Sequence, residues 1–204
     1  CEKMGVTFHY KTRVTEIHHT GSGVRLDWAT TDDTAQQYFN GVVVCAGVGS
    51  RAIAAKLGDR ANIYPVKGYS ITVNLDDSAS QTAAPWMSLL DDEAKVVTSR
   101  LGKNRFRIAG TAEFNGYNLD IRDDRIKPLR DWCETFFPDV STEHCVPWAG
   151  LRPMLPSMMP KVGPGSKPGV YYNTGHGHLG WTLSAATAQL TADTIDMNRM
   201  RNAA

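Results

Sequence analysis

The sequence predicts a mixed α/β (α+β) fold in which a largely antiparallel β-sheet interrupts an α/β unit. Three observations lead to this prediction. A continuous apolar run at 42–48 is typical of a strand that is buried on both faces in a parallel sheet. Several strand-like segments follow one another between 69 and 111, as in an antiparallel sheet. Near the end of the chain, a short strand, a glycine-rich loop and a helix follow in that order.

The first part of the chain is predicted to be a small antiparallel meander followed by a buried strand. Apolar residues alternate with polar ones at 6–18, 24–28 and 37–40, which favours three strands joined as hairpins. The buried strand at 41–48 ends in small residues, and 51–57 is predicted to be the helix after it. Ligands prefer the carboxyl ends of such strands, although a simple strand-to-helix turn explains the small residues equally well.

A domain boundary is predicted near Tyr64, where Pro65 and Gly68 bracket Lys67, a lone cation. Beyond it, a second sheet is expected, with a helix whose apolar residues recur at helical spacing until Pro138. The expected strands of this sheet are 69–75, 86–90, 95–101 and 105–111, and the expected helix is 125–137.

Arg152 lies in an apolar, proline-bounded strand predicted at 146–153. A guanidinium is costly to bury unless it meets an anion, and its planar fork suits a carboxylate. Taken alone, the residue has two explanations: a structural ion pair with an Asp or Glu, which is the commoner case, or a ligand for a bound carboxylate.

The glycine-rich loop follows a strand predicted at 170–173 and precedes a helix predicted at 181–197. Gly175, Gly177 and Gly180 have the spacing G-x-G-x-x-G, which lets a ligand approach the main chain next to the positive end of a helix. A tight strand-to-helix turn is the alternative. The usual dinucleotide motif is excluded, because no second strand with an acidic residue follows. The helix has two apolar faces and is therefore expected to be covered on most sides.

The bulk properties exclude several classes of protein. The 204 residues carry a net charge of +1, which gives no electrostatic case for binding nucleic acid. Four cysteines without C-x-x-C spacing predict neither a disulfide framework nor a metal site. The longest apolar run is too short to span a bilayer.

Four segments together resemble the D-amino-acid dehydrogenase small subunit, within the wider group of D-amino-acid oxidase and glycine oxidase flavoproteins. The resemblance covers about residues 5–195, and the last two segments are its most specific part. The segments are Val-Val-Val-Cys-Ala-Gly at 42–47, Tyr-Pro-Val-Lys-Gly-Tyr-Ser at 64–70, Trp-Ala-Gly-Leu-Arg-Pro-Met at 148–154 and Asn-Thr-Gly-His-Gly-His-Leu-Gly-Trp-Thr at 173–182. Residues 155–158 depart from it, because Leu-Pro-Ser-Met replaces the usual Thr-Pro-Asp-Gly.

The resemblance implies a partial FAD-binding αβ domain that is interrupted by a substrate domain. Residues 1–64 and 151–204 would belong to the FAD-binding domain, and 65–150 would form the substrate-binding domain. The family's glycine-rich motif for the FAD pyrophosphate does not occur in these 204 residues, and there is no initiating Met, so the chain is expected to be the C-terminal portion of a longer protein.

The resemblance also implies roles for individual residues. Arg152 would bind the substrate carboxylate and direct the α-hydrogen to the flavin. His176 and His178 could serve as bases, but their loop position favours packing against the cofactor. The residues implied to bind FAD are Val14, through its backbone at the adenine end, and Ala46, Gly47, Pro65, Lys67, Gly68, Gly175, His176, Gly177, Leu179, Gly180, Trp181 and Thr182.

The activity that follows is the FAD-dependent oxidative deamination of a D-amino acid to a 2-oxo acid and ammonia, with quinone or oxygen as the electron acceptor. The expected location is cytoplasmic, with peripheral association at the inner face of the bacterial inner membrane as a further expectation for the full-length protein. One alternative is an oxidase of glycine, sarcosine or a similar amine that uses oxygen directly. Another is an inactive fragment, or a folding or interaction module.

Overall fold

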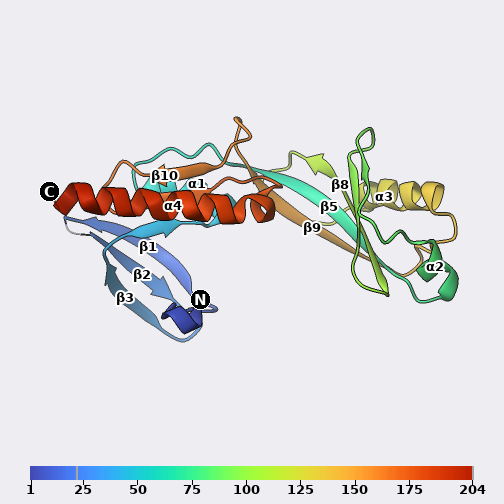
Figure 1. Ribbon diagram of the computed structural model, residues 1–204, viewed down its shortest axis with the longest axis horizontal. Helices are drawn as coiled ribbons and strands as arrows, with labels where there is room; N and C mark the ends of the chain where they lie inside the picture. The colour runs from blue at the N-terminus through green and yellow to red at the C-terminus, as the bar shows by residue number, and fades with distance from the viewer. Residues whose placement is uncertain (22, 204) are drawn as a thin grey trace. The chain divides into compact units, whose positions relative to one another are not determined.

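The computed structural model describes residues 1–21 and 23–203 and divides into two compact units (Figure 1). The first unit combines Cys1–Ile63 with the segment from Pro153 onward, and the second is Tyr64–Arg152. The second unit is thus a continuous insertion between the two segments of the first. That the first unit binds a cofactor and the second a substrate stays a prediction.

The first unit is built around a three-stranded sheet with the order β10-β11-β4. Strand β4 (Val42–Val44) is parallel to β11 (Val170–Thr174), as the apolar run predicted, and β10 (Lys161–Pro164) is antiparallel to β11. The 3₁₀ turn η2 (Gly47–Gly49) and helix α1 (Ser50–Lys56) follow β4. Apolar side chains of the sheet, of α1 and of the segment after it form one buried cluster, which includes Val44, Ala54, Leu57, Ile63, Val170 and Tyr172.

The predicted meander is present as β1 (Arg13–Thr20), β2 (Gly23–Ala29) and β3 (Thr34–Phe39), all antiparallel. The expected start of its first strand at residue 6 was wrong. A short 3₁₀ turn, η1 (Glu2–Met4), is followed by irregular chain up to Arg13, and Lys11 turns the backbone with φ 52°. The alternating residues Phe8 and Tyr10 are exposed and stack on each other, with ring centroids 6.0 Å apart.

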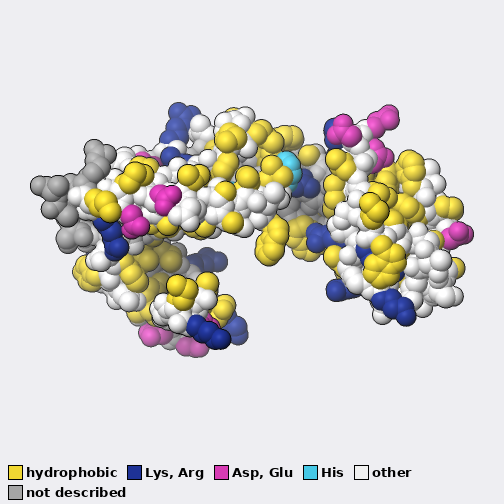
Figure 2. Space-filling model, viewed as in Figure 1, with side chains coloured by type: hydrophobic (Ala, Val, Ile, Leu, Met, Phe, Trp, Pro, Cys, Tyr) yellow, Lys and Arg dark blue, Asp and Glu magenta, His cyan; other side chains and the backbone are white. Residues whose placement is uncertain are grey.

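Helix α4 (Gly180–Ala203) packs on β10 and β11 through a single face. Thr187 and Thr191 are buried on that face. The prediction that the helix is covered on most sides was wrong for this chain, because Leu190 and Met197 are 56% and 58% exposed. Figure 2 shows apolar side chains at the surface along this helix. One sheet can cover only one side of a helix, and the described residues supply no second layer over α4.

The second unit is a five-stranded sheet with the order β6-β7-β8-β5-β9. The pairs β5/β8, β6/β7 and β7/β8 are antiparallel, which confirms the predicted antiparallel sheet. Helix α3 (Asp123–Phe136) packs against β5 and β8, where Tyr69, Ile71, Phe106 and Ile108 form the core with Ile126 and Leu129. The strands are β5 (Tyr64–Asn74), β6 (Leu90–Asp91), β7 (Val96–Arg100), β8 (Arg105–Glu113) and β9 (Cys145–Met154).

Two elements of the second unit differ from expectation. The strand predicted at 86–90 is irregular up to the two-residue strand β6, and Trp86 and Met87 are exposed. Helix α2 (Ser78–Ala83) was not predicted. Its N-cap residue Asp77 accepts a hydrogen bond from the Ser80 backbone N–H at 2.7 Å, which is the interaction that favours Asp at this position.

Candidate functional site

The guanidinium of Arg152 lies against β5 at Gly68. A Cβ atom added to Gly68 would overlap Nη1, Nη2 and Cζ of Arg152, so only glycine leaves room for this side chain. The two residues belong to the two segments singled out in the sequence, and the strands β5 and β9 that carry them are neighbours in the sheet. The structure therefore brings together Gly68 and Arg152, two predicted site residues from distant parts of the sequence.

A β-bulge in β8 supplies the hydrogen-bond acceptor that holds Arg152. Lys67 pairs with Glu113 and Tyr69 pairs with Gly110, so Thr111 and Ala112 together oppose the single residue Gly68. Thr111 takes a left-handed backbone conformation with φ 61°, which is unusual for a β-branched residue. Its carbonyl oxygen accepts a hydrogen bond from Arg152 Nη1 at 2.8 Å. Bulges of this kind often re-aim groups next to active sites.

Arg152 has no carboxylate partner within 4.0 Å in residues 1–21 and 23–203, so the ion pair that the sequence left open is not found there. Burial lowers the pKa of its guanidinium. A partly buried cation with a single backbone acceptor retains several N–H donors for an anion. This arrangement favours the second explanation, a ligand for a bound carboxylate.

Replacing Gly68 with alanine is expected to weaken the binding of a small carboxylate such as propionate about 10-fold, because the new methyl group displaces the guanidinium from its position. Isothermal titration calorimetry of the full-length protein measures this change.

Gly110→Ala is the matched control for this substitution. Its added Cβ would lie 3.1 Å from Leu129, on the α3 side of the same sheet, so it should cost stability without changing propionate affinity. Equal losses of affinity in the two variants would contradict the positioning of Arg152 by Gly68.

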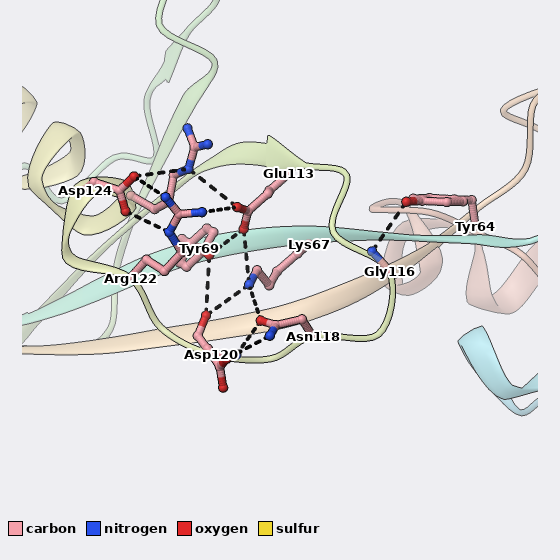
Figure 3. Close-up of polar contacts among 10 residues, drawn as sticks. Tyr64, Lys67, Tyr69, Glu113, Gly116, Asn118, Asp120, Arg122 and Asp124 are labelled. Atoms are coloured by element: carbon pink, nitrogen blue, oxygen red, sulfur yellow. Dashed lines mark hydrogen bonds and ion pairs between the residues drawn. The ribbon is translucent and has the colours of Figure 1, made fainter.

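Lys67 lies at the centre of a buried polar network (Figure 3). Its ammonium is fully buried and directs its hydrogens to three oxygens, at 3.1 Å to Glu113 Oε2 and 3.0 Å each to Asn118 Oδ1 and the Asp120 carbonyl. The network ties the loop after β8 to β5. All three ammonium donors are used inside the second unit, so any contact of Lys67 with a cofactor would come from its backbone.

Glu113 is the acceptor that unites this network. Its carboxylate accepts a hydrogen bond from the Tyr69 hydroxyl at 2.6 Å and lies 3.3 Å from Nη1 of Arg122. The Tyr69 hydrogen bond first, and Lys67 next, lower the pKa of Glu113 below its ordinary 4.5. Burial and the same hydrogen bond raise the pKa of Tyr69. The ionised Glu113 therefore stabilises the fold above pH 4.5, and this contribution is lost as the pH falls through the lowered pKa.

In the first unit, two predicted cofactor loops lie at the same edge of the sheet. Ala46 and Gly47 follow β4, and the loop from Gly175 to Gly180 follows β11; because these strands are parallel, their carboxyl ends meet. Thr174 links the loops through hydrogen bonds, 2.8 Å to the Ser50 hydroxyl and 3.4 Å to the Gly47 carbonyl. Gly47 has φ 54° and open space at the position of a Cβ.

The loop after β11 needs its first two glycines for the fold itself. Gly175 and Gly177 have φ 78° and 59°, and a Cβ at these positions would meet Leu155 and Met154, respectively. His176 lies 3.2 Å from the Thr187 hydroxyl of α4, and burial lowers its pKa. This contact is with helix α4, so the predicted packing of His176 against a cofactor stays a prediction. His178 is exposed.

The remaining predicted residues lie in different surroundings. Pro65 is buried in β5, whereas Leu179 and Trp181, at the start of α4, are 42% and 93% exposed. Gly180 begins α4, and Thr182 is exposed in its first turn. Val14, in β1, lines a small groove of about 140 Å³ with Ile53 of α1. No structural contact yet assigns a cofactor to these residues, so their roles stay predictions.

A cavity of about 730 Å³ is lined by none of the predicted site residues. It runs along β4 in the first unit and is lined by residues that include Val42, Val43, Tyr171 and Ile195. Residues 1–21 and 23–203 hold no cluster of three or more metal-ligating side chains, and none of their helices combines the length and apolarity that a membrane span requires.

Sequence analysis missed the residues that support Arg152 and Lys67. Neither the bulge at Thr111 nor the acceptor role of Glu113 has a local sequence signal, because both depend on the register between β5 and β8. The departure at 155–158 does have a structural counterpart. Met158 has φ 60°, a left-handed conformation, at the position where the family pattern has glycine.

The family match identifies the chain as belonging to a class of flavoproteins. The family model described as FAD dependent oxidoreductase matches residues 1–194, and the chain belongs to this family. The family depends on FAD, and Gly47, at the edge of the β4/β11 sheet, leaves open space beside the main chain.

Two curated relatives of the chain are D-amino acid dehydrogenases. The chain is 60% identical over 197 residues to D-amino acid dehydrogenase 3 of Mesorhizobium japonicum. The aligned region covers 96% of this chain and 47% of that protein. It is 36% identical to a D-amino acid dehydrogenase of Neisseria meningitidis, over 96% of this chain and 45% of that protein. The chain thus spans about half the length of the curated relatives that it matches.

A solved structure shares the fold. Glycine oxidase from Geobacillus kaustophilus superimposes with a TM-score of 0.79 at 23% identity, over 91% of this chain and 48% of that one.

Proposed function

We propose that the chain is part of an FAD-dependent dehydrogenase that oxidatively deaminates D-amino acids. The observation that carries the proposal is Arg152, a partly buried guanidinium that has no carboxylate partner among the described residues and is held in place by Gly68 and Thr111. The 60% identity to a D-amino acid dehydrogenase supports the same substrate class. The products are a 2-oxo acid and ammonia, formed when water hydrolyses the imino acid.

The residues of the chain have separable tasks in this proposal. Arg152 binds the substrate carboxylate through its free N–H donors and so fixes the orientation of the α-carbon. Ala46, Gly47 and the loop from Gly175 to Thr182 would hold FAD at the shared edge of β4 and β11. FAD, when bound, supplies the acceptor for the α-hydrogen as hydride. The amine loses a proton to solvent, so the chemistry does not require a base from the chain.

The proposed dehydrogenase and its nearest alternative, an amine oxidase, differ in their electron acceptor. A dehydrogenase passes electrons to an acceptor other than oxygen, such as a quinone, whereas an oxidase of glycine or sarcosine forms hydrogen peroxide from oxygen. The likeness to glycine oxidase shows a shared fold at 23% identity, and the 60% identical relative is named a dehydrogenase. We therefore propose quinone as the acceptor, and we expect a cytoplasmic location for the full-length protein, at the inner face of the bacterial inner membrane. A peroxide assay during turnover separates the two activities.

The visible absorption spectrum of the purified chain, with and without added FAD, tests the proposal directly. Flavin bands that bleach when D-alanine is added without oxygen would support the cofactor, the reaction and the substrate class together. If the full-length protein also shows no flavin bands, or bands that D-alanine leaves unchanged, the proposed function is wrong. The chain would then be an inactive or purely structural module.

A further inference from the structure

The two faces of β5 differ in what they carry. Tyr69, Ile71 and Val73 point into the core beneath α3. Side chains alternate along a strand, so Gly68, Ser70 and Thr72 lie on the opposite face. The guanidinium of Arg152 lies on this second face, over Gly68. Ser70 is two residues further along the same face, or about 7 Å along the strand.

Ser70 is a buried hydroxyl without a hydrogen-bond partner. It is 1% exposed, and its Oγ atom bonds to no group in residues 1–21 and 23–203. On β8 it is paired with Ala109, whose side chain offers no polar atom. A buried hydroxyl that lacks a partner is disfavoured relative to one in water, so its presence requires an explanation.

Strand β9 places a half-exposed aromatic side chain, Trp148, beside Ser70. Asn74 of β5 donates a hydrogen bond to the His144 carbonyl at 3.0 Å, while Arg152 lies over Gly68, so β5 and β9 run in opposite directions. Residues 148–150 of β9 therefore flank Ser70. The ring of Trp148 lies over Gly150 and is 55% exposed, and the guanidinium of Arg107 lies 5.3 Å from its centroid.

We propose that Ser70 is a second ligand for the substrate carboxylate, donating its hydroxyl hydrogen to the carboxylate that Arg152 binds. This inference rests on the proposed function. A carboxylate has about four acceptor sites, and a guanidinium fork uses two of them, which leaves an oxygen free for a hydroxyl donor on the same face. In this proposal the Trp148 ring moves away from Arg107 to admit the substrate, and the hydroxyl of Ser70 gains its hydrogen-bond partner only in the complex.

The test compares Ser70→Ala with Thr72→Val in the full-length, FAD-loaded protein. Thr72 is the next residue on the same face and serves as the matched control. Propionate, which has the carboxylate of D-alanine without its amine, is titrated against the flavin absorbance. Ser70→Ala is expected to weaken propionate binding about 10-fold and to raise the KM for D-alanine by a similar factor, as for loss of a hydrogen bond to a charged group. Thr72→Val should change neither by more than about two-fold.

Thermal unfolding distinguishes this role from a structural one. Because the Ser70 hydroxyl has no partner in the free protein, Ser70→Ala should unfold at the same temperature as wild type or higher. Unchanged propionate binding in Ser70→Ala would overturn the inference. A raised KM for D-alanine with unchanged propionate affinity would also overturn it, since the hydroxyl would then contact the amine.

Arg152→Met separates failure of this inference from failure of the proposed function. If that variant loses propionate affinity and Ser70→Ala does not, only the role of Ser70 is wrong. If neither variant loses affinity, the carboxylate site itself is wrong.

Discussion

Arg152→Met is expected to raise the KM for D-amino acids about 100-fold while the FAD content of the full-length protein stays unchanged. The size follows from the loss of a charged, desolvated hydrogen-bonding group that pairs with an ionised ligand. Methionine fills a similar volume, so the packing over Gly68 is largely kept. Steady-state kinetics with D-alanine give the KM, and the ratio of flavin to protein absorbance gives the FAD content.

Two further variants sharpen this prediction. Arg152→Lys keeps the charge but loses the planar fork, so its KM should lie between those of wild type and Arg152→Met. Arg105→Met removes an exposed arginine from β8 and should leave the KM at the wild-type value. If Arg152→Met has a wild-type KM, the carboxylate role is refuted. If it loses its flavin instead, Arg152 belongs to the cofactor site.

Glu113→Leu is expected to lower the midpoint of thermal unfolding by about 10 °C, because it leaves a buried ammonium without its carboxylate. Lys67 is fully buried, and the carboxylate of Glu113 is its ionic partner at 3.1 Å. The same substitution removes the acceptor of the Tyr69 hydroxyl. Differential scanning calorimetry of wild type and variant measures the change.

The double variant Lys67→Met with Glu113→Leu tests the cause. Removing both charges should restore part of the lost midpoint, since an apolar pair avoids the desolvation of either ion. Below pH 4.5, wild type loses stability because protonation of Glu113 removes a stabilising charge. The double variant lacks this carboxylate, so its stability should decrease less over the same pH range. A double variant that is less stable than Glu113→Leu would contradict this account. Lys127→Met, at an exposed helix pair with Asp131, should change the midpoint by only a few degrees at most.

Local patterns in the sequence predicted most strands and helices, because the spacing of apolar residues along a segment reflects which of its faces is buried. The apolar run before Cys45 predicted a parallel strand, and the residues around Arg152 predicted an apolar strand with an unusual cation. The predictions were wrong where the burial of a side chain depends on whether another helix or strand packs over it. Phe8 and Leu190 lie in apolar patterns, yet both are exposed, because no described element packs over them.

The candidate site was predictable in part. Gly68 and Arg152 were identified from a family resemblance, but their contact depends on the pairing of strands β5 and β9. The sequence pointed to Lys67 as a lone cation, and only the fold reveals that Glu113 and the loop after it enclose its ammonium. Nothing in the sequence distinguishes Thr111 or Ser70. The bulge in β8 gives Thr111 its role as an acceptor for Arg152, and the face of β5 that Ser70 shares with Gly68 places its unpartnered hydroxyl on the Arg152 side of the sheet.

The insertion of the second unit into the first has a consequence for the order of folding. Ser50 and Thr174, which link the two cofactor loops, are 124 positions apart. As the chain leaves the ribosome, residues 64–152 can complete their own sheet before β11 has been made. Strand β4 must then wait for residues 170–174, but the folded insertion shortens the flexible loop that has to close. The two predicted cofactor loops therefore come together only after Val170–Thr174 has been made, and a nascent chain that lacks this strand holds only one of them.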